Sequence, residues 1–130
     1  MRLLPGLLDA AAQAALLDEV LAKAAAAPFV TPLMPRSGTP MRVLQTNLGP
    51  LGWVTDKERG YRYEPAHPET GAPWPPIPAS LLALWRTLTG YADPQACLVN
   101  LYRGEARMGL HVDADEQDGN APVLSVSLGD

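Results

Sequence analysis

The chain has very few of the residues that build covalent cross-links or multi-histidine sites. It contains one cysteine, Cys97, and two histidines among 130 residues. A single cysteine excludes an internal disulfide and fits a reducing compartment. No apolar run reaches the length of a membrane span, and the N-terminus does not resemble a signal peptide. We therefore expect a cytoplasmic protein that does not associate with a membrane.

Basic residues are absent from the C-terminal segment 108–130, which holds five acidic residues and no lysine or arginine. Residues 31–107, in contrast, hold eight basic residues and six acidic ones, within a chain of net charge −4. Carboxylates without basic partners repel one another, and a divalent cation relieves that repulsion. The acidic segment is therefore either part of a metal site or a solvated loop.

The residues that are present indicate one α+β domain. Apolar residues make up 47% of the chain, and 14 prolines and 11 glycines favour many turns over a helical bundle. A helix is predicted over residues 9–27, where Asp9 can accept hydrogen bonds as the N-cap. A second helix is predicted over residues 80–89, with Ser80 as its N-cap and Gly90 at its C-terminal end.

Alternating side chains predict strands in the second half of the chain. Leu98, Asn100 and Tyr102 would share one face of the first of these strands. The proline-rich segment 28–79 is predicted to be a layer of loops and short strands on the core, with one strand assigned within it. Strands at this spacing suggest a β-sandwich or barrel of the jelly-roll kind. The predicted strands cover residues 41–47, 97–103, 108–112 and 122–128.

His111 and Asp113 form the motif with the clearest chemical meaning. Two residues apart on a strand, they point to the same side and offer one imidazole nitrogen and one carboxylate oxygen. This is two thirds of the 2-His-1-carboxylate triad of non-haem iron(II) sites. No histidine follows position 111. The alternative is a surface histidine beside an acidic turn. The other histidine, His67, lies in a turn sequence and is predicted to be at the surface.

Two further groups of side chains suit ligand binding. Asn100 and Tyr102 would project an amide and a phenol into a pocket, which suits a carboxylate or keto acid, although both also occur at ordinary strand ends. Trp53, Tyr61 and Tyr63 alternate with basic residues, as on surfaces that stack bases and contact phosphates. The alternative is a loop that its aromatic side chains attach to the core. The interleaved basic residues are Lys57, Arg59 and Arg62.

Taken together, several segments in the same order resemble the AlkB family of iron(II)- and 2-oxoglutarate-dependent dioxygenases, of the bacterial nucleic-acid repair type. The resemblance implies a double-stranded β-helix (jelly roll) core with N-terminal helices and a nucleotide-recognition lid. It divides a single domain into an N-terminal helix (1–30), a lid region (31–79) and a helix with the first jelly-roll strands (80–130). The segments that carry the resemblance are 46–53, 60–65, 73–78, 96–102, 110–116 and 121–129.

The resemblance also implies roles for particular residues. It implies Fe(II) and 2-oxoglutarate as cofactor and cosubstrate, and a lid that grips a nucleobase. Gln45 occupies a position where an apolar contact near the substrate would be expected, which leaves the base preference open. The implied residues are His111 and Asp113 for iron and catalysis, Asn100, Leu101 and Tyr102 for 2-oxoglutarate, and Trp53, Tyr61, Arg62, Tyr63 and Asp115 for the substrate.

The implied reaction is oxidative dealkylation of N-alkylated bases in DNA or RNA, with O₂ and 2-oxoglutarate giving succinate, CO₂ and an aldehyde. The implied partner is alkylated, single-stranded nucleic acid, bound by a monomer. The family's second iron-binding histidine and its 2-oxoglutarate arginines would lie beyond residue 130. We therefore expect a partial domain, truncated before the sheet is complete and inactive as given. The alternatives are a related dioxygenase acting on protein or a small molecule, and an inactive nucleic-acid-binding fragment.

Overall fold

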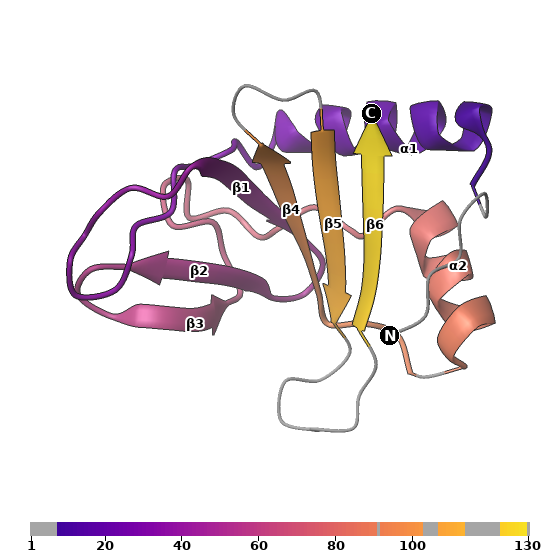
Figure 1. Cartoon of the computed structure of the whole chain (residues 1–130). Helices are drawn as coiled ribbons and strands as arrows, with labels where there is room; N and C mark the ends of the chain where they lie inside the picture. The colour runs from indigo at the N-terminus through magenta and orange to yellow at the C-terminus, as the bar shows by residue number, and fades with distance from the viewer. Residues whose placement is uncertain (1–7, 91, 103–106, 114–122, 130) are drawn as a thin grey trace.

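A computed structural model describes residues 8–90, 92–102, 107–113 and 123–129. Its strands form one antiparallel four-stranded sheet in the order β1-β4-β5-β6 and a separate hairpin of β2 and β3 (Figure 1). The predicted α+β class is confirmed. The elements are α1 (Ala10–Ala24), β1 (Val43–Leu48), β2 (Gly52–Asp56), β3 (Gly60–Glu64), α2 (Ala79–Thr89), β4 (Ala96–Tyr102), β5 (Arg107–Asp113) and β6 (Val123–Gly129).

The two helices begin by different means. The Asp9 side chain accepts a hydrogen bond from the Ala12 backbone N–H at 2.8 Å, which confirms the predicted N-cap of α1. The prediction of Ser80 as the N-cap of α2 is wrong, because Pro78 holds that position without a side-chain hydrogen bond. Its restricted φ starts the helix before Ser80, which then lies in the first turn. Gly90 ends α2 in the left-handed conformation at φ 62°, as predicted.

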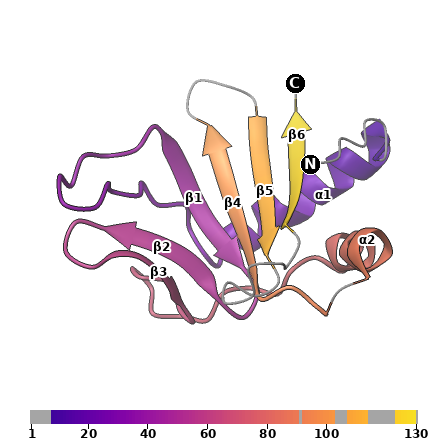
Figure 2. The same ribbon diagram turned by 60° about the horizontal axis from the view of Figure 1, so that its bottom comes forward.

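Both helices lie on the same face of the four-stranded sheet (Figure 2). Leu16 and Val20 of α1 and Leu81 and Trp85 of α2 are buried against the inward side chains of the sheet. Fully burying each large apolar side chain contributes about 1.5–3 kcal/mol. In the described residues no helix is long and apolar enough to cross a membrane. The inward sheet residues are Leu48, Cys97, Val99, Met108, Leu110, Val112, Val126 and Leu128.

The proline-rich segment contains loops and short strands, as predicted. Besides β1, it contains the β2–β3 hairpin, which lies beside the lower end of β1 in Figure 1. Val30 forms two backbone hydrogen bonds with Gln45, so the segment before β1 pairs along the outer edge of that strand. No helix or strand covers residues 73–78, in agreement with their prolines. The Asn47 side chain of β1 bonds to the backbone of Trp53 in β2, which holds the hairpin at the same edge of the sheet.

Candidate active site

The face of the sheet opposite the helices carries polar side chains. Antiparallel register aligns Asn100 of β4 with Gln45 of β1 on one side and Gly109 of β5 on the other. The next row on the same face contains His111 of β5 and its partner Ser125 of β6. Because side chains of one row lie close together, the register brings Asn100 and His111 into adjacent rows. The sequence predicted the two faces of each strand, but not this alignment.

The side chain of His111 is half-buried. Its ring forms a hydrogen bond with Ser125 of the neighbouring strand β6. Its Nδ1 lies 3.2 Å from the Ser125 hydroxyl oxygen. Within the described residues, its Nε2 has no hydrogen-bond partner. A hydrogen on Nδ1, donated to the Ser125 hydroxyl, leaves the lone pair of Nε2 free for a metal ion. The contact with Ser125 therefore holds one nitrogen of the ring and leaves the other open on the polar face.

The predicted second iron ligand lies at the end of the same strand. Asp113 is the last residue of β5, and its backbone is paired with Ala96 and Val123. Its side chain and the whole of Asp115 lie outside the described residues. In the part of the chain that is described, no three His, Cys, Asp or Glu side chains are grouped so as to hold a metal ion. The structure thus describes the backbone of both predicted iron ligands, which belong to the same strand, and the side chain of His111.

Asn100 is buried and bonded to Gln45, the residue at the position where an apolar contact near the substrate was expected. Its Oδ1 accepts a hydrogen bond from Nε2 of Gln45 at 2.7 Å, and each side chain is 7% exposed. The two residues are direct partners in the β1–β4 ladder. A hydrogen bond between buried side chains resists rearrangement, because leaving either group unpaired costs free energy. The amide of Asn100 is therefore held in one position.

Tyr102 and Leu101 point to opposite faces of β4. The ring of Tyr102 lies across Gly109, where an added Cβ would be 3.6 Å from Cε2 of the ring. Tyr102 therefore covers the row that contains Asn100. Leu101 packs against the apolar core on the helix side. Its side chain consequently does not share the polar face, and only its backbone borders the other two residues predicted to bind 2-oxoglutarate.

The hairpin separates its aromatic side chains from its charged ones. Trp53 is the cross-strand partner of Tyr63, and its indole stacks on Tyr61 with ring centroids 5.1 Å apart and an interplanar angle of 28°. The Asn47 side chain bonds to both the N–H and the C=O of Trp53 at 3.0 Å. Since Asn47 belongs to β1, these bonds fix the aromatic face to the edge of the main sheet.

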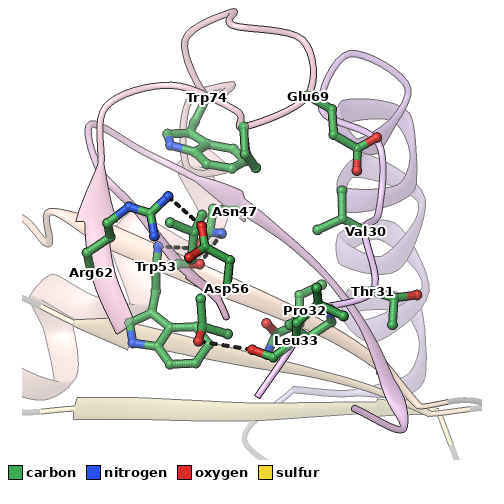
Figure 3. Close-up of a pocket in the computed structure, with 14 residues that line it drawn as sticks. Val30, Thr31, Pro32, Leu33, Asn47, Trp53, Asp56, Arg62, Glu69 and Trp74 are labelled. Atoms are coloured by element: carbon green, nitrogen blue, oxygen red, sulfur yellow. Dashed lines mark hydrogen bonds and ion pairs between the residues drawn. The ribbon is translucent and has the colours of Figure 1, made fainter. Parts of the chain in front are cut away.

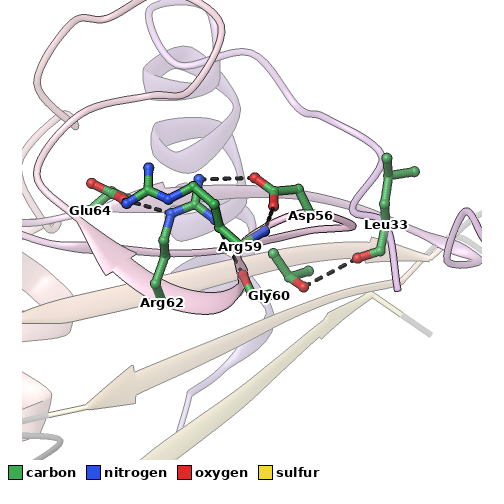
Figure 4. Close-up of polar contacts among 7 residues, drawn as sticks. Leu33, Asp56, Arg59, Gly60, Arg62 and Glu64 are labelled. Atoms are coloured by element: carbon green, nitrogen blue, oxygen red, sulfur yellow. Dashed lines mark hydrogen bonds and ion pairs between the residues drawn. The ribbon is translucent and has the colours of Figure 1, made fainter. Parts of the chain in front are cut away.

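Arg62 belongs to the other face of the hairpin and is engaged by two carboxylates (Figure 4). Its guanidinium lies 3.0 Å from Asp56 and 2.6 Å from Glu64. The Arg59 backbone N–H, followed by the Arg62 side chain, lowers the pKa of Asp56 below its ordinary value. Arg62 is thus tied within the hairpin, and a phosphate would have to compete with these acids for it.

A cavity of about 160 Å³ lies between the hairpin and the segment before β1 (Figure 3). Gln45 and Asn47 of β1 line it from the sheet, and Trp53 and Trp74 line it from the hairpin side. Ligand pockets usually measure about 300–1,000 Å³. This cavity therefore suits a group of side-chain size, and it borders the buried amide of Gln45.

The prediction that His67 lies at the surface is wrong, because the residue is 2% exposed. Its Nδ1 accepts the backbone N–H groups of Glu69 and Thr70 at 3.0 and 3.3 Å. Its Nε2 lies 2.8 Å from the Pro28 carbonyl and donates to it. The ring also packs against the indole of Trp74, with the two ring centroids 5.2 Å apart. His67 is therefore a structural residue, and its turn is folded around the ring.

Comparison with known proteins shows the family to which the chain belongs. The family model described as the 2OG-Fe(II) oxygenase superfamily matches residues 1–130. The alpha-ketoglutarate-dependent dioxygenase AlkB homolog of Caulobacter vibrioides is 57% identical over 127 residues, which are 97% of this chain and 57% of that protein. Alpha-ketoglutarate-dependent dioxygenase AlkB of Escherichia coli is 45% identical over 111 residues, which are 82% of this chain and 50% of that protein.

A third relative, alpha-ketoglutarate-dependent dioxygenase AlkB of Salmonella typhimurium, is 44% identical over 119 residues, 88% of this chain and 54% of that protein. The chain thus spans about half the length of the curated relatives it matches. The jelly-roll fold that the superfamily implies agrees with the antiparallel sheet. The chain belongs to the 2OG-Fe(II) oxygenase superfamily, and the prediction that it is a member of the AlkB family is confirmed.

Proposed function

We propose that the chain forms part of an iron(II)- and 2-oxoglutarate-dependent dioxygenase that removes N-alkyl groups from nucleobases of DNA or RNA. The observation that carries the proposal is the polar face on which Asn100, Tyr102 and His111 come together beside the stacked Trp53–Tyr61 pair. The relatives are named alpha-ketoglutarate-dependent dioxygenases, which supports the same class of reaction.

The donor set at His111 fits a ferrous ion. Its Nε2 is free of protein hydrogen bonds within the described residues, while Nδ1 is supported by Ser125. In the proposed site, His111 and Asp113 hold the iron and thereby act as the catalytic residues of this chain. Bound iron(II) with 2-oxoglutarate and O₂ supplies the oxidation that hydroxylates the N-alkyl carbon, after which the base is restored and an aldehyde leaves.

The proposed site for 2-oxoglutarate lies on the Asn100–Tyr102 face. A carboxylate accepts hydrogen bonds, and these two side chains can donate them from an amide N–H and a phenol O–H. Leu101 would contribute through its backbone, because its side chain packs on the core. The iron-binding and cosubstrate-binding residues then stand in neighbouring rows of one rigid sheet, which fixes their separation.

The aromatic face of the hairpin is the proposed grip on the nucleobase. Trp53 and Tyr61 stack on each other, and Tyr63 is next to Trp53, so a flat base can extend the stack. Arg62 shapes this hairpin through its two carboxylate partners and would contact phosphate only by exchanging one of them. Asp115 is proposed to contact the damaged base. Alkylated single-stranded nucleic acid as partner, a monomeric state and a cytoplasmic location complete the proposal.

The proposal is tested by incubating the full-length protein with iron(II), 2-oxoglutarate and a methylated single-stranded oligonucleotide. Succinate and formaldehyde should form in equal amounts while methyl groups are lost from the bases. The unmethylated oligonucleotide and a methylated peptide serve as control substrates. Succinate formed with the peptide but not with the oligonucleotide would contradict the nucleobase as substrate, and no succinate in any reaction would contradict the dioxygenase.

A further inference from the structure

The Gln45–Asn100 pair links two buried amides that could in principle bond in either orientation. In the structure Nε2 of Gln45 donates to Oδ1 of Asn100 at 2.7 Å, and both side chains are 7% exposed. Gln45 is itself fixed, because its backbone N–H and C=O both bond to Val30 at 2.8 Å. Its side chain therefore reaches Asn100 from a strand that is paired on both edges.

The orientation of the Asn100 amide decides what it can bind. One end of a carboxamide is an acceptor and the other carries two N–H donors, whereas a carboxylate only accepts. When Oδ1 is occupied by Gln45, Nδ2 is the end left to face a ligand. The reversed amide would direct Oδ1 toward a carboxylate and repel it. In the observed arrangement, Gln45 donates to Oδ1 and thereby holds Asn100 with its N–H donors outward.

We propose that Gln45 is a positioning residue, which holds the Asn100 carboxamide so that Nδ2 donates to a carboxylate of 2-oxoglutarate. This inference rests on the proposed function and deepens it. Gln45 acts through Asn100 and is not required to contact 2-oxoglutarate itself. It also accounts for a polar residue in a place where an apolar one was expected from the sequence.

Two substitutions at position 45 separate orientation from packing. Gln45→Leu removes the hydrogen bond, leaves the amide free to rotate and gives an expected rise in the Kd for 2-oxoglutarate of about threefold. Gln45→Glu replaces the donor with acceptors, attracts Nδ2 of Asn100 and turns Oδ1 toward the ligand. The Kd is then expected to rise by about tenfold or more.

Thr46→Val is the matched control. Thr46 is adjacent to Gln45 in β1, faces the other side of the strand, and its hydroxyl donates a buried hydrogen bond to the Ala27 carbonyl at 2.6 Å. The substitution removes a buried hydrogen bond from the same strand, yet it does not touch Asn100. The melting temperature of the Thr46→Val variant should fall, while its Kd for 2-oxoglutarate stays at the wild-type value.

The measurement is titration calorimetry of the full-length protein with 2-oxoglutarate in the presence of Mn(II), with the melting temperature of each variant recorded. The inference holds when the Kd increases in the order wild type, Gln45→Leu, Gln45→Glu. The inference is overturned if Gln45→Leu binds 2-oxoglutarate with wild-type affinity, or if the two variants bind it equally well. If Gln45→Glu does not fold, the affinity of Gln45→Leu decides the outcome. A wild-type protein that binds no 2-oxoglutarate overturns the proposed function itself.

Discussion

Ser125 Oγ lies 3.2 Å from Nδ1 of His111, and the two residues are direct partners in the β5–β6 ladder. The hydroxyl can accept the Nδ1 hydrogen and so keep Nε2 available for a metal ion. Partners of this kind orient a ligating imidazole and make it a better ligand. Removing this contact is therefore a direct test of whether His111 binds a metal.

Ser125→Ala should weaken metal binding by about tenfold, because the imidazole loses the group that fixes its tautomer and orientation. The Kd for iron(II), measured anaerobically by calorimetry, provides the check. Ser127→Ala is the control, since Ser127 is an exposed residue of the same strand but pairs with Gly109 rather than with His111. Equal effects of the two substitutions would show that the Ser125 hydroxyl does not support the ligand.

The two histidines should give opposite results when each is changed to alanine. His111→Ala should abolish metal binding and change the free energy of unfolding by less than about 1 kcal/mol, because the ring is half-buried. His67→Ala should retain metal binding and lower the free energy of unfolding by about 2–4 kcal/mol, because it removes a buried ring together with its hydrogen bonds to the Pro28 carbonyl and the Glu69 N–H. Metal titration and urea unfolding of both variants make the comparison. Metal binding retained in His111→Ala would remove this residue from the site.

Trp53→Ala should raise the KM for methylated oligonucleotide by about tenfold, with a smaller change in the KM for 2-oxoglutarate. The loss of one stacking platform typically costs about 1–3 kcal/mol per base. Trp53→Phe is the control, because it keeps an aromatic ring against Tyr61 and should recover most of the affinity. Unchanged kinetics in Trp53→Ala would identify the tryptophan as purely structural.

The Asp56–Arg62 ion pair predicts a loss of hairpin stability in acid. The pKa of Asp56 is lowered in the folded state, first by the Arg59 backbone N–H and then by the Arg62 side chain. Its stabilising contribution is therefore present above its ordinary pKa of 3.8 and is lost as the pH falls through the lower folded-state value. Asp56→Asn should reduce the melting temperature at pH 7 more than at pH 2.5. An equal reduction at both pH values would contradict a lowered pKa of Asp56 in the folded hairpin.

Local patterns were sufficient for much of the fold. The alternation in residues 97–103 predicted which side chains share a face, and β4 has Cys97 and Val99 buried together on the core side. Asp9 and Gly90 were recognisable as helix caps from their residue types. The β2–β3 hairpin was not assigned among the short strands expected in this segment, because its charged turn separates Trp53 from Tyr61 and Tyr63 and obscures their alternation.

The sequence by itself determined the two faces of each strand, and with them that Asn100 and Tyr102 share one side, because alternation depends only on neighbouring residues. The pairing of β4 with β5 placed His111 on that same side. Only the tertiary structure decided that Gln45 meets Asn100 and that Ser125 meets His111. Those contacts depend on strand register, and a shift of one residue would turn each side chain to the opposite face. The burial of His67 has the same origin, since its acceptor, the carbonyl of Pro28, is 39 residues away in the chain.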